Sequence, residues 1–163
     1  MFLGAVASTG EKSPPIWFPQ GFRLNAEAYI EALKKTLIPW MRRVAAAHGG
    51  ARPAPILFQQ DGAPAHTAKA TVNFLEEEGI PFIKPNQWPP CSPDLNPLDY
   101  SIWSLVTAGT AGMTRPSSVK ALQRQIGTAW RNMDPETIRS SCRAFRPRLQ
   151  KCIAANGSFF DKN

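Results

Sequence analysis

The sequence predicts a domain of the α/β or α+β class with a mixed sheet, and three observations support this. Short apolar runs bounded by Gly, Pro, Ser or Asp predict strands at residues 2–8, 15–19, 56–60 and 80–83. Longer stretches with an apolar residue every three or four positions predict helices between and after these strands. The 163 residues, 43% hydrophobic and 19% charged, have a globular composition and enough chain for one core.

The first two strands are predicted to form a hairpin, because Gly10 supplies a turn and Ser and Pro flank it. Asn25 then caps a helix whose apolar face recurs at three- and four-residue intervals, at Ile30, Leu33, Leu37, Met41 and Val44. Pro39 should kink or interrupt this helix, because it has no backbone N–H. Residues 48–50 end the helix, and a proline-rich loop leads to the strand before Asp61.

Beyond Asp61, a helix is predicted from about His66 to Glu78, and Gly79 stops it. Residues 80–83 then lead into a loop, 88–97, whose four prolines exclude helix and central strand. Asn96 is the predicted N-cap of the next helix, with Pro97 at its first position. This arrangement places Asp99 in the first turn, at the positive end of the helix.

Two more helices follow, the first capped by Ser117 or Ser118 and the second started by Asp134-Pro135. Pro147 should bend the second one. Four basic residues lie opposite its apolar positions: Arg139, Arg143, Arg146 and Lys151. Such residues usually only solvate a helix, but their number also fits a surface that faces phosphate and contacts DNA.

Charge is spread unevenly along the chain, whose formal net charge is +7. Residues 1–60 carry seven Lys or Arg against three acids, residues 61–100 two against six, and residues 101–163 ten against three. A chance fluctuation on a solvated surface is one interpretation. The other is a carboxylate site for cations within a basic frame for phosphate.

Asp61 and Asp99 are the candidate site residues. Asp61 follows a strand, and sites in open α/β sheets form at the carboxyl ends of strands. Asp99, taken alone, is explained by helix capping and the helix dipole. Asp94 fits turn chemistry, and His66, at a helix start, is more often a structural hydrogen-bonding residue than a catalytic one.

Two stretches resemble the catalytic domain of the mariner-like (Tc1/mariner) DDE/D transposases. They are residues 60–66, Gln-Asp-Gly-Ala-Pro-Ala-His, and residues 88–103, Trp-Pro-Pro-Cys-Ser-Pro-Asp-Leu-Asn-Pro-Leu-Asp-Tyr-Ser-Ile-Trp. The resemblance implies an RNase H-like mixed sheet flanked by helices, with Asp61 and Asp99 as the family's second and third catalytic carboxylates. It also implies that His66 lies behind the metal ligands and supports them without binding the metal itself.

The chemistry that the resemblance implies is divalent-metal-dependent DNA cleavage and strand transfer, as in an endonuclease that integrates a transposable element. Two ions of Mg²⁺ or Mn²⁺ would bind between carboxylates. The implied partner is transposon-end DNA, the implied compartment is the nucleus, and a homodimer is left open.

The chain departs from the family pattern before Phe2. The family's first catalytic Asp lies on an earlier, central strand, and its helix-turn-helix region lies earlier still. Residues 1–163 are therefore expected to be a single, amino-terminally truncated RNase H-like domain, inactive by itself. The alternative is a non-catalytic nucleic-acid-binding or interaction module that uses the basic carboxyl-terminal helices.

The sequence has no pattern typical of a membrane segment, a signal peptide or a cysteine-based metal site. No apolar run reaches the ~18 residues of a membrane span, and the apolar start has no basic leader, so neither a membrane segment nor a signal peptide is expected. The three cysteines have no metal-binding spacing, which fits a reducing compartment.

Overall fold

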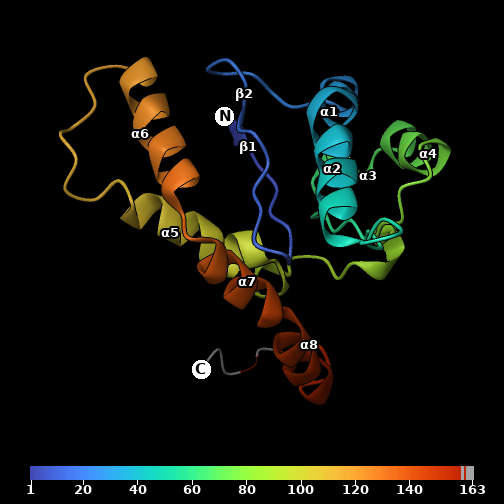
Figure 1. Ribbon diagram of the computed structural model, residues 1–163. Coiled ribbons are helices and arrows are strands. Elements are labelled where there is room, and N and C mark those ends of the chain that lie inside the picture. The colour runs from blue at the N-terminus through green and yellow to red at the C-terminus, as the bar shows by residue number, and fades with distance from the viewer. Residues whose placement is uncertain (159, 161–163) are drawn as a thin grey trace. The chain divides into compact units, whose positions relative to one another are not determined.

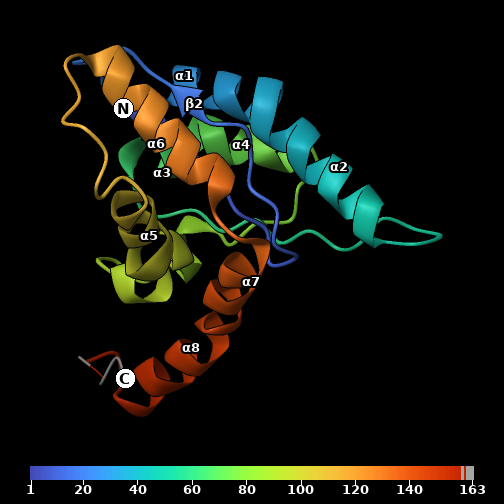
Figure 2. The same cartoon turned by 60° about the vertical axis from the view of Figure 1, so that its left-hand side comes forward.

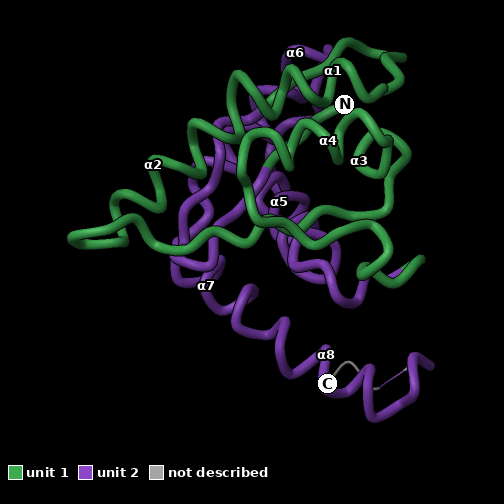
Figure 3. The backbone as a smooth tube through the Cα atoms, turned by 90° about the vertical axis from the view of Figure 1, so that its right-hand side faces the viewer, with its two compact units in different colours: residues 1–4, 16–91 green, residues 5–15, 92–163 purple. Residues whose placement is uncertain are grey.

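The computed structural model describes residues 1–158 and residue 160, and it divides into two compact units (Figure 3). Unit 1 consists of Met1–Gly4 and Ile16–Cys91. Unit 2 consists of Ala5–Pro15 and the chain from Ser92 onward. Among the described residues, no helix is both long enough and apolar enough to cross a membrane.

Unit 1 begins with an antiparallel pair of short strands, β1 (Phe2–Leu3) and β2 (Ile16–Trp17). Phe2 lies opposite Trp17, and their rings stack with centroids 4.8 Å apart. The predicted pairing of the two strands is therefore confirmed, although both are shorter than expected.

A long helical path follows: α1 (Ala26–Ala32), a π-helical turn (Leu33–Leu37) and α2 (Ile38–His48) (Figure 1). Asn25 caps α1, since its side-chain oxygen accepts the N–H of Ala28 at 2.9 Å. The predicted interruption near Pro39 is confirmed. Pro39 offers no N–H, and the widened turn that precedes it is closed by the N–H of Ile38 bonding to Leu33.

The helix predicted over 66–78 is split into α3 (Pro64–Thr67) and α4 (Lys69–Glu77), both of which contact α1 (Figure 2). Ala68 between them has an extended backbone with ψ 137°. The buried Thr71 hydroxyl donates to the Ala65 carbonyl at 2.7 Å, which ties the two pieces together. Gly79 has φ +64° and ends the helix, as predicted.

The mixed sheet predicted from the sequence does not form within the described residues, which are mostly helical with one two-stranded sheet. The stretch before Asp61 makes a single parallel bridge, Phe58 with Phe82. Phe58 donates to Pro81 at 2.8 Å and accepts from Ile83 at 3.0 Å. Prolines 81 and 85 cannot donate, and residues Pro85–Gln87 turn away as a 3₁₀ helix, so the ladder does not extend.

Unit 2 contains the tip of the amino-terminal hairpin, where Gly10 has φ +104° in the turn, and two short helical turns, Pro93–Leu95 (3₁₀) and Leu98–Ile102 (π). Four helices follow: α5 (Trp103–Ala108), α6 (Val119–Asn132), α7 (Pro135–Arg143) and α8 (Phe145–Ala154). The indole of Trp130 is buried and donates to the Ser13 carbonyl at 2.9 Å. It also stacks on Trp103, so the hairpin tip, α5 and α6 share a core.

The predicted caps of the last helices are confirmed: Ser118 accepts from Ala121 and Asp134 accepts from Thr137. The expected single helix with a bend at Pro147 is wrong in one respect. The break falls at Ala144, and Pro147 lies in the first turn of α8, where its missing N–H costs little.

Candidate active site

Asp61 lies in unit 1, in the loop between the Phe58 bridge and α3. Its Oδ1 accepts two hydrogen bonds, from the backbone N–H of Ala63 at 3.0 Å and from Nδ1 of His66 at 2.6 Å. The first is an Asx-type turn, which follows from an Asp placed before Gly62. The side chain is about half exposed, at 48%, so the carboxylate is fixed on one oxygen yet remains reachable from solvent.

His66 is buried, and a network that crosses unit 1 holds it in place. Its ring lies against the ring of Tyr29 on α1, with centroids 4.2 Å apart. The Tyr29 hydroxyl donates to Gln60 at 2.9 Å, and the Gln60 amide donates to the His66 carbonyl at 3.2 Å. Nε2 of His66 is buried without a hydrogen-bond partner among the described residues. The imidazole therefore directs its polar contact at Asp61.

These contacts change the acidity of two groups. The hydrogen bond from His66 lowers the pKa of Asp61, partial burial opposes this, and the Ala63 N–H adds to the lowering. Burial raises the pKa of Tyr29, and the nearby negative charge of Asp61 raises it further. Asp61 is therefore a carboxylate at neutral pH, and Tyr29 remains a neutral hydrogen-bond donor.

Asp99 lies in unit 2, on an exposed part of the first turn after the proline-rich loop. Asn96 acts as the predicted cap: its side-chain oxygen accepts the Leu98 N–H at 3.2 Å, and its carbonyl accepts the Asp99 N–H at 2.9 Å. The Asn96 amide also donates to Oδ2 of Asp99 at 2.9 Å. The predicted position of Asp99 at a helix start is therefore confirmed.

Asp61 and Asp99 belong to different units, and their sharing of a metal stays a prediction of the sequence. Within the described part of the chain, no three His, Cys, Asp or Glu side chains are close enough together to hold a metal ion. Asp94, the other acid of the loop, is half-buried, and its carbonyl accepts from Arg148 at 3.4 Å.

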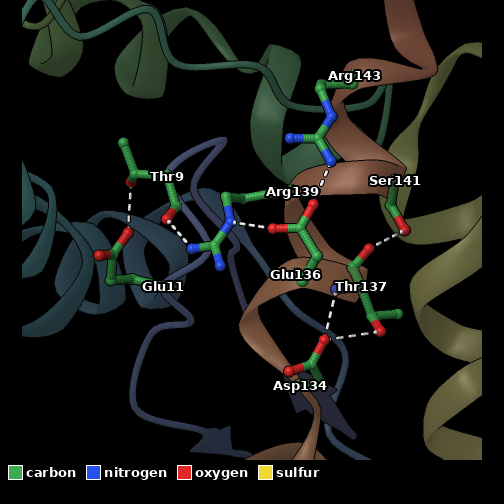
Figure 4. Close-up of polar contacts among 8 residues, drawn as sticks. All are labelled: Thr9, Glu11, Asp134, Glu136, Thr137, Arg139, Ser141 and Arg143. Carbon is green, nitrogen blue, oxygen red and sulfur yellow. Dashed lines mark hydrogen bonds and ion pairs between the residues drawn. The ribbon is translucent and has the colours of Figure 1, made fainter.

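The four basic residues proposed for DNA contact have different surroundings. Arg139 donates to the Thr9 carbonyl at 3.0 Å and to Glu136 at 2.7 Å, and Arg143 pairs with the other oxygen of Glu136 (Figure 4). Both guanidinium groups lower the pKa of Glu136. Arg139 therefore links α7 to the hairpin tip. Arg146 and Lys151 lie exposed on α8.

Tyr29 and Gln60 are the residues that sequence reasoning missed. Gln60 directly precedes Asp61, so its place beside the candidate acid was the available signal. Tyr29 lies four positions before Leu33, on the buried face of its helix, and no local pattern reports its role, because its hydroxyl partner is 31 residues away in the chain.

Comparison with known proteins gives a consistent family. No family model matches the chain. The Tcb1 transposase of Caenorhabditis briggsae is 26% identical over 134 residues, which cover 82% of this chain and 45% of that protein. The Tc1 transposase of Caenorhabditis elegans is 30% identical over 101 residues, 62% of this chain and 35% of that protein. The chain thus spans less than half the length of these curated relatives.

Solved structures of the Mos1 transposase, a mariner protein of Drosophila mauritiana, also match. Its catalytic domain with raltegravir and Mg aligns with TM-score 0.70 and 25% identity, covering 93% of this chain and 70% of that one. The catalytic domain alone gives TM-score 0.77 at 21% identity, covering 99% and 82%. A Mos1 paired-end complex with the left transposon end gives 0.73 at 24% identity, covering 94% and 42%. The chain is therefore a homologue of the Tc1/mariner transposases, and the region that it matches is their catalytic domain.

Proposed function

We propose that the chain is the catalytic domain, in partial form, of a DDE/D transposase that cleaves and joins DNA phosphodiesters, with Asp61 and Asp99 as metal-binding carboxylates. The observation that carries this proposal is the Asp61 carboxylate. One of its oxygens is fixed by His66 and Ala63, and the other accepts no hydrogen bond from the described residues. A carboxylate that is oriented, ionised and half exposed is suited to binding a cation.

The donor set fits Mg²⁺ or Mn²⁺, because carboxylate oxygens are the hard ligands that both ions prefer. Asp61 and Asp99 would hold the metal, and His66 would orient Asp61 from behind. Bound metal would activate the attacking oxygen and stabilise the leaving oxygen of a phosphodiester, as in two-metal sites. The chain's own part is to keep both acids ionised and in place.

We further propose that residues 1–163 form one partial RNase H-like domain, in which the segments around Phe58 and Phe82 are neighbouring parallel strands. Their single bridge supports this arrangement. We do not assign the third carboxylate to any of the three acids before Asp61, because each has another local role. Glu11 accepts from Thr9, Glu27 lies in the first turn of α1, and Glu31 pairs with Lys35. The 163-residue chain by itself therefore supplies two of three carboxylates and is expected to be inactive.

The proposed partner is transposon-end DNA, in the nucleus, and the relative's paired-end complex supports this choice. Arg146 and Lys151 on α8 remain proposed DNA contacts. Arg139 and Arg143 are less available, because Glu136 already neutralises part of their charge. A homodimer would fit the pairing of two ends.

Metal binding tests the proposal directly. Mn²⁺ titrated into the 163-residue chain and followed by its electron paramagnetic resonance signal should bind. Asp61→Asn and Asp99→Asn should each weaken that binding about tenfold or more, and Asp94→Asn, an acid of the same loop, should leave it unchanged. Equal binding by all four proteins would overturn the assignment.

Activity gives a second readout. With Mg²⁺ or Mn²⁺, the purified 163-residue chain is expected not to nick supercoiled DNA. Metal-dependent nicking that Asp99→Ala abolishes would show that the chain is catalytically complete and would refute the proposed inactivity.

The alternative function is a non-catalytic nucleic-acid-binding module. The observation in its favour is the ten basic residues against three acids beyond residue 100. Salt-dependent DNA binding without Mn²⁺ binding, and unaffected by Asp61→Asn or Asp99→Asn, would support this alternative over the catalytic domain.

A further inference from the structure

Helix α6 in unit 2 carries three basic residues and no acidic one, over the 14 residues of Val119–Asn132. Lys120, Arg124 and Arg131 are all exposed. None of them forms an ion pair with a described residue, and the one polar contact among them is Arg131 to the Thr128 hydroxyl at 3.1 Å. Positive charge is therefore left uncompensated along this helix.

The three side chains form a single row. At 3.6 residues per turn, positions 120, 124 and 131 fall within an arc of about 40° around the helix axis. At 1.5 Å per residue the row is about 16 Å long. A would-be Cβ at Gly127 would lie 3.4 Å from the Arg131 guanidinium, so that side chain lies along the helix and continues the row. We call Lys120, Arg124 and Arg131 the α6 stripe.

The opposite side of α6 fixes how the stripe is presented. Ala129, nearly opposite the stripe, and Trp130, about 100° around the helix from it, are buried, and Trp130 is anchored by its bond to Ser13 and its stacking on Trp103. The Ser118 side chain caps the amino-terminal end of the helix. These contacts hold α6 in an orientation in which the α6 stripe is exposed.

Several basic residues outside α6 are paired with acids, unlike those of the α6 stripe. Lys35 pairs with Glu31, Arg42 with Glu78 and Lys84 with Glu76, all in unit 1. Arg139 and Arg143 share Glu136 on α7. In these places an acid competes with any anionic partner, whereas on α6 no acid among the described residues does.

We propose that the α6 stripe binds the phosphate backbone of duplex DNA. A row of exposed Lys and Arg gives charge complementarity to evenly spaced phosphates and confers no base specificity. The inference rests on the proposed function, since it names the surface by which the catalytic domain would hold its DNA. It differs from the α7 and α8 contacts predicted from the sequence.

The test compares two triple variants that lose the same three positive charges. One removes the stripe, as Lys120→Gln/Arg124→Gln/Arg131→Gln. The other removes paired residues, as Lys35→Gln/Arg42→Gln/Lys84→Gln. Binding of a short duplex DNA of arbitrary sequence is measured by fluorescence anisotropy over a range of NaCl concentrations.

The stripe variant should reduce the slope of log K against log salt by about 2.7, or about 0.9 for each phosphate that the protein no longer neutralises. The paired variant should change the slope much less. Equal slopes for both variants would overturn the inference, and so would a wild-type chain that fails to bind DNA. If the stripe variant fails to fold by circular dichroism, Arg124→Gln alone should lower the slope by about 0.9.

An acidic polypeptide is the competing partner. Polyglutamate binding that depends on the stripe while the DNA slope does not would overturn the DNA assignment. The Mn²⁺ titration of the aspartate variants uses no DNA, so failure of the α6 stripe and failure of the proposed function give different results.

Discussion

The two candidate acids are held in different ways. The Asp61 carboxylate receives a buried imidazole that is supported by Tyr29 from another helix, so unit 1 must fold before the contact exists. The Asp99 carboxylate receives the amide of Asn96, three residues earlier, on an exposed turn stiffened by prolines. Tertiary packing thus orients one acid and local sequence orients the other. Changes at Tyr29, far from Asp61 in the chain, should disturb Asp61, whereas Asp99 should respond to changes at Asn96, three residues away.

The largest expected effect is that of His66→Ala. The substitution removes a buried hydrogen bond and the packing against Tyr29, and we expect it to lower the free energy of unfolding by about 2–4 kcal/mol. Urea unfolding followed by circular dichroism measures this loss. The exposed residue Lys69 provides the control, since Lys69→Ala should change stability by no more than about 0.5 kcal/mol. A loss below about 1 kcal/mol for His66→Ala would show that packing does not hold Asp61.

Tyr29→Phe should have the next largest effect. It removes one hydroxyl and leaves the Gln60 oxygen without its donor in a partly buried place, which costs about 1–2 kcal/mol. Because the Tyr29 ring packs on His66, which bonds to Asp61, Tyr29→Phe should weaken Mn²⁺ binding through Asp61 and should add little to the effect of Asp61→Asn. If the double variant loses Mn²⁺ affinity additively, this would contradict the proposal that Tyr29 acts on Asp61 through His66.

Asn96→Ala should cost about 1 kcal/mol, because it removes a partly buried helix cap. Asn96→Asp separates the two roles of this side chain, which accepts from the Leu98 N–H and donates to Asp99. It keeps the cap acceptor but replaces the amide donor with a second carboxylate, so the pKa of Asp99 should rise while stability is retained. Nuclear magnetic resonance titration of the Asp99 carboxyl carbon gives the readout, and an unchanged pKa would exclude Asn96 as its stabilising neighbour.

Glu136 extends the comparison to a third, fully exposed carboxylate, and its effect should be the smallest. Hydrogen bonds from Arg139 and then Arg143 lower its pKa from the ordinary 4.5. A carboxyl group whose pKa is lower in the folded state stabilises the fold above its unfolded pKa and loses this contribution as pH falls. The stability difference between wild type and Glu136→Gln should be constant from pH 7 to about 5 and vanish below its folded pKa. Urea midpoints across that range test this. A stability difference between the two proteins that grows as the pH falls would contradict a lowered pKa for Glu136.

Local features of the fold were well predicted, since they depend on near neighbours in the chain. The caps at Asn25, Asn96, Ser118 and Asp134 follow from the preference of these side chains for the free N–H groups of a first turn. The interruption near Pro39 follows from its missing donor. The resemblance in residues 60–66 and 88–103 likewise gave the family that the comparisons then supported.

The sheet was predicted less well, because strand pairing depends on a partner that is remote in sequence. An apolar run can be read from the sequence, but its ladder forms only where a second strand offers donors and acceptors in register. Around Phe58 that partner is the segment at Phe82, whose prolines limit it to one bridge. The division of the predicted helices at Ala68 and Ala144 arose in the same way, from packing that periodicity does not report.

The sequence by itself determined the helix starts, the turns, the family and the two candidate acids, because each of these is encoded in residues a few positions apart. Only the tertiary structure decided which groups surround those acids. Tyr29, Gln60 and His66 meet around Asp61 because the buried face of α1 packs on α3, and Arg139 is bound to Glu136 and Thr9 because α7 lies against the hairpin tip. Contacts of this kind depend on burial of distant apolar surfaces, which no local pattern records.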